Sequence, residues 1–224
     1  MPRSKVATLD QALAKCHDGM TVMLGGFTNV GSPNKFCRAL ADTGIKDLHI
    51  IANDAGNDKA DGIGTFIVEG RASSLVASHV GLNPKVAEQM NAGTLAVTLV
   101  PQGTLAERIR CGGCGLGGVL TPTGVGTIVE DNPYCLGKQT INGKDYLLMA
   151  PIHADFAVIA GYKIDKAGNV WYKGTTSNFN IVMATAADTV IAEAEQVVEI
   201  GGIAPEDVRT SGVFVDYVVE GGLY

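Results

Sequence analysis

Short apolar segments alternate with helical segments along the first half of the chain, and three of the apolar segments run straight into loops rich in glycine and polar residues. TVML at 21–24 is followed by GGFTNVGSP, DLHIIA at 47–52 by NDAG, and LAVTLV at 95–100 by PQGT. Strands that alternate with helices predict a parallel sheet with helices on both faces. We therefore expect an α/β fold built on an open, mostly parallel sheet.

Helix signals flank these strands. Thr8 and Gln11 fit a capping box before a helical apolar pattern, and Ser32 with Pro33 fit an N-cap and first helical residue for a helix that stops at Gly44. Further expected helices run from 83–84 to about 93 and over 104–110. Further expected strands cover 75–78, 156–160, 189–192 and 212–219, with a turn at 166–169. His49, inside an apolar strand, is expected to be a core histidine.

The length of 224 residues indicates a single domain over 1–224. The chain holds 29 glycines, about twice the usual share of ~7%. Many fall in 111–150, where we expect an irregular lobe or a flap that faces a partner. The uncharged stretch 111–129 has the composition of a loop and not of a membrane helix.

Charge and cysteine content narrow the function classes. The net charge of −6 with 17 Lys and Arg leaves no general basic field for nucleic acid or an anionic membrane. We find no signal peptide. The five cysteines are scattered in a chain that is long enough to fold without disulfide bonds, which predicts reduced thiols in the cytoplasm. Cys111 and Cys114 have CxxC spacing but no second ligand pair nearby, so no metal site is expected.

The loop Gly25–Gly31 is the strongest binding candidate. Ligands of open α/β sheets bind beyond the carboxyl ends of the strands, and this loop also leads into a helix N-terminus, which favours an anion. The alternative is a turn that only permits tight helix–strand packing. GGFTNVG is not the dinucleotide pattern G-x-G-x-x-G, and no Walker motif is present.

The stretch 18–33, DGMTVMLGGFTNVGSP, meets every fixed position of the first signature of the family I CoA-transferases. That signature is an Asp/Asn-Gly pair, two free positions, three apolar residues, Gly-Gly-Phe, three free positions, Gly, one free position and Pro. IANDAG, VPQGTLAERIRCGGCGLGG and TPTGVGT resemble other conserved blocks of the family. The resemblance covers essentially the whole chain and is strongest to the A (alpha) subunit of the 3-oxoacid, acetate (butyrate)–acetoacetate type. It implies the CoA-transferase (NagB/RpiA-like) fold.

The resemblance also implies a ping-pong transfer of CoA between a short-chain acyl-CoA and a free carboxylate. Coenzyme A is then a substrate, and no tightly bound cofactor is expected. In the family, the nucleophile is a glutamate of a Ser-Glu-x-Gly type motif in the B part, and no glutamate of this chain follows a serine. The resemblance therefore implies a B (beta) subunit that carries the glutamate, an A2B2 heterotetramer, and a site at the A–B junction.

By the same resemblance, Gln102 supplies an amide near the reacting carbonyl and Asn53 gives polar support. A preorganised donor to a developing oxyanion is worth roughly 3–4 kcal/mol. The alternative is that each amide only forms hydrogen bonds within its own turn. The expected substrate-binding residues form one loop: Gly25, Gly26, Phe27, Thr28, Asn29, Val30 and Gly31. Phe27 either walls an acyl pocket or belongs to the core.

Arg108 and Arg110 either contact CoA phosphates or lie on a solvated helix face. Two other functions compete with CoA transfer. One is a non-catalytic module of the same fold that binds a CoA ester or a sugar phosphate. The other is a related isomerase, for which Asp54 is the only obvious carboxylate at the strand ends.

Overall fold

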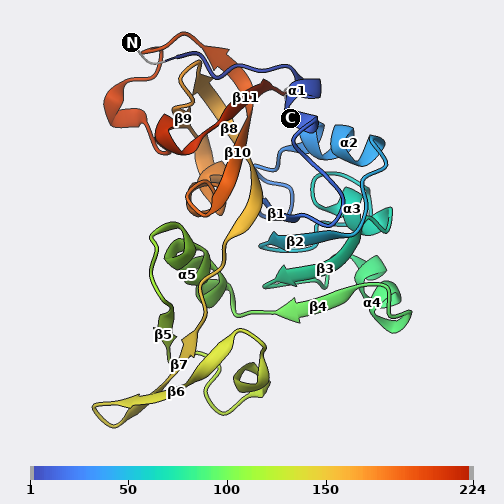
Figure 1. Cartoon of the computed structure of the whole chain (residues 1–224), viewed down its shortest axis with the longest axis vertical. Coiled ribbons are helices and arrows are strands. Elements are labelled where there is room, and N and C mark those ends of the chain that lie inside the picture. The colour runs from blue at the N-terminus through green and yellow to red at the C-terminus, as the bar shows by residue number, and fades with distance from the viewer. Residues whose placement is uncertain (1–2, 222–224) are drawn as a thin grey trace.

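The computed structural model describes residues 3–221, which form one large and one small sheet (Figure 1). In the large sheet the strand order is β11-β10-β8-β1-β2-β3-β4, and all of these neighbours pair in parallel. A short strand, β9, pairs antiparallel with β8. The predicted open, mostly parallel sheet is confirmed.

The strands of the large sheet have the following bounds: β1 Thr21–Leu24, β2 Leu48–Ala52, β3 Ala72–Ala77, β4 Ala96–Leu99, β8 Ala154–Asp165, β9 Val170–Trp171, β10 Ala187–Val198 and β11 Tyr217–Glu220. The helices are α1 Leu9–Leu13, α2 Asn34–Asp42, α3 Gly64–Val68, α4 Pro84–Asn91, α5 Gln102–Gly113 and α6 Asn180–Met183. Short 3₁₀ turns are η1 Ile128–Asp131, η2 Gly174–Ser177, η3 Pro205–Asp207 and η4 Gly212–Phe214.

Helices cover both faces of the large sheet, as predicted. Two apolar clusters form, and along β1 the side chains alternate between them: Val22 and Leu24 belong to one and Met23 to the other. The first cluster takes apolar residues from α1 to α4 and the second from α5 and α6. Because both faces are buried, the central strands are apolar over most of their length, which is why they could be recognised in the sequence.

Several element boundaries differ from the sequence prediction. Helix α2 begins at Asn34 and has no side-chain cap, so the proposed Ser32 cap is wrong. The expected strand at 212–219 is wrong in its first half, where η4 lies. His49 is exposed and pairs through Nδ1 with Ser74 Oγ at 2.8 Å, so it is not a core residue.

The segment 111–150, expected to form an irregular lobe or a flap, is more regular than its composition indicates. Its first residues complete α5, and β5 Val119–Thr121, β7 Lys144–Met149 and β6 Cys135–Ile141 form a three-stranded antiparallel sheet. Figure 1 shows this small sheet projecting beyond α5, away from the large one. A Cβ at Gly112 would collide with the Ile152 carbonyl, so this glycine marks a close approach of helix and backbone and not a loop.

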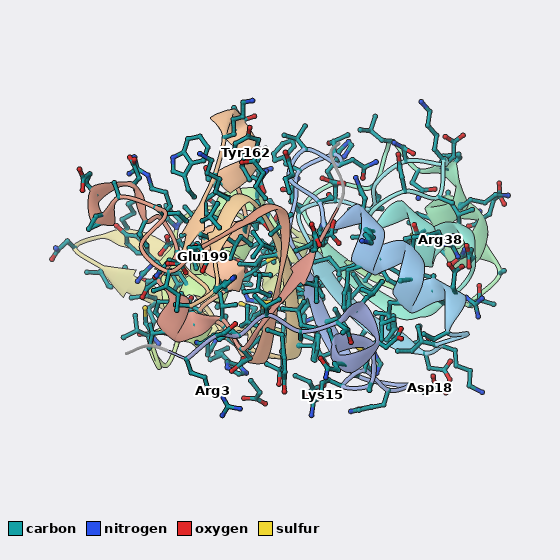
Figure 2. All side chains as sticks on the ribbon, turned by 90° about the horizontal axis from the view of Figure 1, so that it is seen from above. Arg3, Lys15, Asp18, Arg38, Tyr162 and Glu199 are labelled. Atoms are coloured by element: carbon teal, nitrogen blue, oxygen red, sulfur yellow. The ribbon has the colours of Figure 1, made fainter. Side chains whose placement is uncertain are left out.

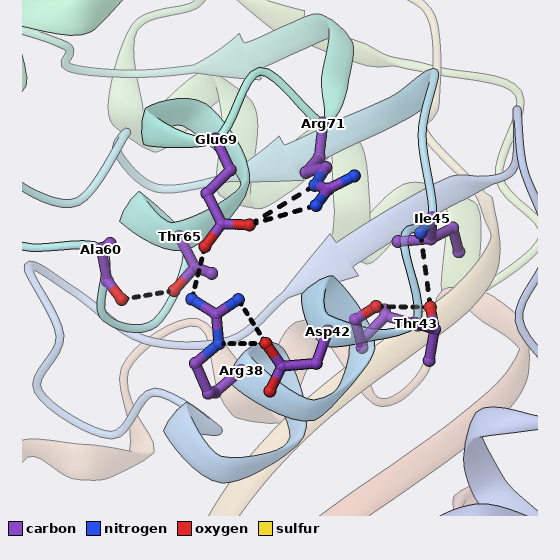
Figure 3. A network of polar contacts seen from close by, with 9 residues as sticks. Arg38, Asp42, Thr43, Ile45, Ala60, Thr65, Glu69 and Arg71 are labelled. Carbon is purple, nitrogen blue, oxygen red and sulfur yellow. Dashed lines mark hydrogen bonds and ion pairs between the residues drawn. The ribbon is translucent and has the colours of Figure 1, made fainter.

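Charged side chains lie mainly at the periphery. Figure 2 shows Arg3, Lys15, Asp18 and Arg38 at the outside of the molecule. Arg38 on α2 contacts Asp42 and also Glu69 after α3, and Glu69 in turn contacts Arg71 (Figure 3). These exposed pairs connect two neighbouring helices but add little stability each.

No helix within residues 3–221 combines the length and the apolar character needed to cross a bilayer.

Candidate functional site

The structure brings the two predicted amide side chains together. Asn53 directly follows β2, and Gln102 is the first residue of α5, just after β4. Gln102 Nε2 donates to Asn53 Oδ1 at 2.7 Å. Ser78, which follows β3, donates through Oγ to the same oxygen at 3.0 Å. Three neighbouring strands therefore deliver polar side chains to one point at their carboxyl ends.

Asp54 lies beneath this amide pair and is almost fully buried, at 3% exposure. Its Oδ2 accepts from Asn53 Nδ2 and from the Thr28 backbone N–H, each at 2.8 Å. Its Oδ1 accepts from the Gly56 backbone N–H at 2.8 Å. One carboxylate thus joins the amide pair to the loop 25–31.

The loop 25–31 ends in a tight turn. Phe27 and Val30 exchange backbone hydrogen bonds of 3.0 and 2.9 Å, and the two residues between them have positive φ, 46° at Thr28 and 67° at Asn29. Phe27 is 44% exposed and Val30 46% exposed. The core alternative for Phe27 is therefore wrong. Both apolar side chains border a small cavity of about 210 Å³ together with Thr175 and Asn178.

The glycines of this loop are required by packing within the chain. A Cβ at Gly25 would collide with the Asn180 side chain, and a Cβ at Gly26, where φ is 120°, would collide with Ser32 Oγ. At Gly31 it would lie 2.6 Å from the Thr176 carbonyl oxygen. The protein itself fills the space at the Cβ position of Gly26, which favours the alternative that these glycines permit tight packing.

The N-terminus of α2 is already occupied by an anion of the chain. Glu193 on β10 is 1% exposed, and its oxygens accept from the backbone N–H groups of Phe36 at 2.6 Å and Lys35 at 3.3 Å. Burial raises the pKa of Glu193 to about 7, against the lowering effect of these two N–H groups and of the Lys35 charge. The expected anion site at this helix end is therefore internal.

The two arginines of α5 differ in environment. Arg110 is exposed and pairs with Glu107 at 2.8 Å, which fits the solvated helix face. Arg108 is fully buried, its guanidinium lies 4.1 Å from the Tyr134 ring centre, and its Nε donates to the Ala150 carbonyl at 2.7 Å. Burial lowers the pKa of Arg108 to about 10. This side chain connects α5 to the segments that flank the small sheet. Because its charge is buried, it does not fit the expected contact with a CoA phosphate.

The CxxC pair is split between two environments. Cys111 is buried in α5, and burial raises the pKa of its thiol, whereas Cys114 is exposed after the helix end. Within residues 3–221 no group of histidine, cysteine and acidic side chains has the arrangement of a metal site.

An apolar groove adjoins the amide pair. It has a volume of about 530 Å³ and lies between β4 and η1, and its lining includes Ser78, Pro101, Leu99 and Ile128. Ile128 is 85% exposed and Leu99 52%. Sequence reasoning missed this groove and also Ser78, although Ser78 follows β3 just as Asn53 follows β2.

Comparisons with known proteins identify the family of this chain. Residues 6–221 match the family model described as coenzyme A transferase. The chain is 45% identical to the acetate CoA-transferase subunit alpha of Escherichia coli, over 97% of each chain. It is 46% identical to the acetoacetyl-CoA:acetate/butyrate CoA transferase alpha subunit of Clostridium acetobutylicum, over 97% of this chain and 98% of that one. The chain therefore belongs to the coenzyme A transferase family, and it is an enzyme subunit of the CoA-transferase class.

Longer and more distant relatives share the fold. The chain is 40% identical to human mitochondrial succinyl-CoA:3-ketoacid coenzyme A transferase 2, over 92% of this chain but only 43% of that protein. Among solved structures, glutaconate coenzyme A-transferase from Acidaminococcus fermentans superposes with a TM-score of 0.85 at 19% identity, over 98% of this chain and 76% of that one. An acyl-CoA transferase from Escherichia coli gives a TM-score of 0.85 at 21% identity, and this chain spans 47% of that chain.

Proposed function

We propose that this chain is the alpha subunit of a two-subunit enzyme that transfers CoA between a short-chain acyl-CoA, such as acetyl-, butyryl- or acetoacetyl-CoA, and a free short-chain carboxylate. The observation that carries the proposal is the Asn53–Gln102 amide pair, which lies at the carboxyl ends of parallel strands in a chain of this family. The names of the bacterial relatives that are 45% and 46% identical support the short-chain acids.

The proposed chemistry is a ping-pong transfer in which a glutamate carboxylate attacks the thioester carbonyl. The C–S bond breaks, and an acyl–glutamyl anhydride and CoA thiolate form. The thiolate then attacks the glutamyl carbonyl, which releases the first carboxylate and leaves an enzyme–CoA thioester. The acceptor carboxylate reverses these two steps. Each attack builds an oxyanion, and the neutral amide of Gln102 is suited to donate to it, while Asn53 holds that amide.

We propose that the glutamate belongs to a beta subunit. No glutamate among residues 3–221 forms a hydrogen bond with Asn53 or Gln102. Glu193, the buried one, has its oxygens on backbone N–H groups of α2. The human relative is more than twice as long as this chain, which leaves room there for a second part. An A2B2 assembly in the cytoplasm, with coenzyme A as substrate and no bound cofactor, completes the proposal.

The loop 25–31 is the proposed contact for the acyl-CoA. Its backbone turn at 27–30 carries two exposed apolar side chains, Phe27 and Val30, and Asp54 connects it to the amide pair through Thr28. Its glycines serve the path of the loop, so the contact to substrate is assigned to the turn and not to space above Gly25 or Gly26.

The test is to purify this chain with the beta-type subunit encoded beside it and to screen acyl-CoA donors and carboxylate acceptors. The complex is then incubated with acyl-CoA alone, the thioester is trapped with borohydride or hydroxylamine, and mass spectrometry locates the modified residue. We expect the modification on a glutamate of the partner. Modification of this chain, or full transfer by this chain alone, refutes the subunit assignment. Binding of CoA esters without any transfer identifies the non-catalytic module instead.

A further inference from the structure

We infer that Asp54 is a positioning residue whose carboxylate determines which way the amides of Asn53 and Gln102 face. The inference deepens the proposed function and rests on it for its catalytic consequence. Its structural part stands on the hydrogen bonds alone.

The direction of each hydrogen bond follows from the donors that surround Asp54. Two of its partners, the backbone N–H groups of Thr28 and Gly56, can only donate. Both carboxylate oxygens therefore act as acceptors, and the Asn53 atom that faces Oδ2 must be the donor Nδ2. The orientation of the Asn53 amide is thereby assigned by its surroundings.

The assignment propagates to Gln102. With Nδ2 of Asn53 facing Asp54, its Oδ1 faces Gln102 and Ser78. Gln102 donates to this oxygen, whereas the single hydroxyl hydrogen of Ser78 is shared between it, at 3.0 Å, and the Asn53 backbone carbonyl, at 2.8 Å. The Gln102 atom at 2.7 Å must then be Nε2. A primary amide nitrogen carries two hydrogens, so Gln102 keeps one N–H that this network does not use. Among residues 3–221 its side chain forms no other hydrogen bond, and the residue is exposed.

Burial makes the arrangement rigid. Asn53 is 2% exposed and Asp54 3%, so water does not compete for these bonds. A reversed Asn53 amide would place its oxygen against the Asp54 carboxylate, so that two acceptors would face each other. The same carboxylate holds the Thr28 N–H in a turn whose central residues have positive φ, so one group sets both the amide pair and the turn of the loop 25–31.

Two variants of Asp54 separate this role from a general effect on folding. Asp54→Ala removes every acceptor, whereas Asp54→Asn can keep its oxygen toward Thr28 and Asn53 and leave only the Gly56 N–H opposed. The matched control is Asp58→Ala, which removes the same charge from an exposed position of the same segment. Circular dichroism and assembly with the partner subunit verify that each variant folds.

The first measurement is the NMR signal of the Gln102 side-chain amide. Glutamine side-chain amides are labelled isotopically in the full chain and observed by NMR, and Gln102→Ala assigns the Gln102 signal. We expect Asp54→Ala to move this signal as Asn53→Ala does, and we expect Asp54→Asn and Asp58→Ala to leave it near its original position. An unmoved Gln102 signal in folded Asp54→Ala overturns the inference.

The second measurement is a double-mutant cycle on kcat in the assembled complex. Asp54→Ala should lower kcat at least about 10-fold in the normal background and less than about threefold in the Gln102→Ala background, because it acts through Gln102. Equal losses in the two backgrounds overturn the catalytic part of the inference. If the NMR signal moves but Gln102→Ala itself leaves kcat unchanged, the positioning by Asp54 stands and the proposed role of Gln102 fails.

Discussion

Glu193 offers the sharpest test of the electrostatics of this fold. The carboxyl is buried on β10, it accepts two backbone N–H groups at the start of α2, and the charge that acts on it is the Lys35 ammonium. Burial is the largest effect, and it raises the pKa from 4.5 to about 7. The perturbation that tests this is Glu193→Gln, which is neutral at every pH.

The size of the effect follows from the shift. At ~1.36 kcal/mol per pKa unit, a rise from 4.5 to about 7 corresponds to about 3 kcal/mol. Because the folded-state pKa is raised, the folded chain holds the proton more tightly than the unfolded chain. The contribution of Glu193 to stability is therefore complete below pH 4.5 and is lost as the pH rises through about 7.

Glu193→Gln removes this pH dependence and costs about 1 kcal/mol, because an amide has one acceptor oxygen for the two N–H groups. We expect the variant to be less stable than the original chain by about 1 kcal/mol near pH 4.5 and more stable by about 2 kcal/mol near pH 8. Urea unfolding of both proteins across this range measures the difference. A difference in unfolding free energy that stays constant between these two pH values refutes the raised pKa.

Three further outcomes are expected. Gln102→Ala should lower the turnover of the assembled complex by ~10²-fold if its amide donates to the oxyanion, and unchanged turnover excludes that role. Gly26→Val should destabilise folding by about 3 kcal/mol or more, because the valine Cβ would collide with Ser32 Oγ at a φ of 120°, and a variant that keeps the stability of the original chain in urea unfolding contradicts this. The double variant of Cys111 and Cys114 to serine should hold the same amount of metal as the original protein in elemental analysis, and a stoichiometric metal lost on substitution contradicts this.

The parallel sheet could be predicted because most buried residues of the central strands lie in short apolar runs of the sequence. The buried parts of β1 and β2, VML at 22–24 and IIA at 50–52, are apolar throughout, as segments covered on both faces must be. The small sheet at 119–149 escaped prediction for the opposite reason. In β6 all but the first side chain are exposed, so CLGKQTI has no apolar alternation to reveal it. The glycines before it have the composition of a loop, although Gly112 lies in α5 against the Ile152 carbonyl.

The site was predictable only residue by residue. Asn53 and Gln102 were identified through the resemblance to the family, and their places at the carboxyl ends of apolar strands agree with it. Ser78 in the same position was missed, and Asp54 was noted only as a carboxylate for a competing function. The partners of Asp54 come from residue 28 and from its own loop, and no local pattern reports such a contact.

The sequence therefore determined the class of fold, the order of its main elements and the family, because strand burial, helix periodicity and the glycine signature depend on adjacent residues. The two amides followed from the resemblance to that family. Only the tertiary structure decided which anion lies at the start of α2, why glycine stands at 26, and how the amides are oriented. The first depends on atoms far apart in the chain, since 157 positions separate Glu193 from Phe36, and the other two depend on how loops fold back on nearby residues. Contacts of that kind arise when the sheet closes, and they are selected by packing and hydrogen-bond satisfaction and not by sequence spacing.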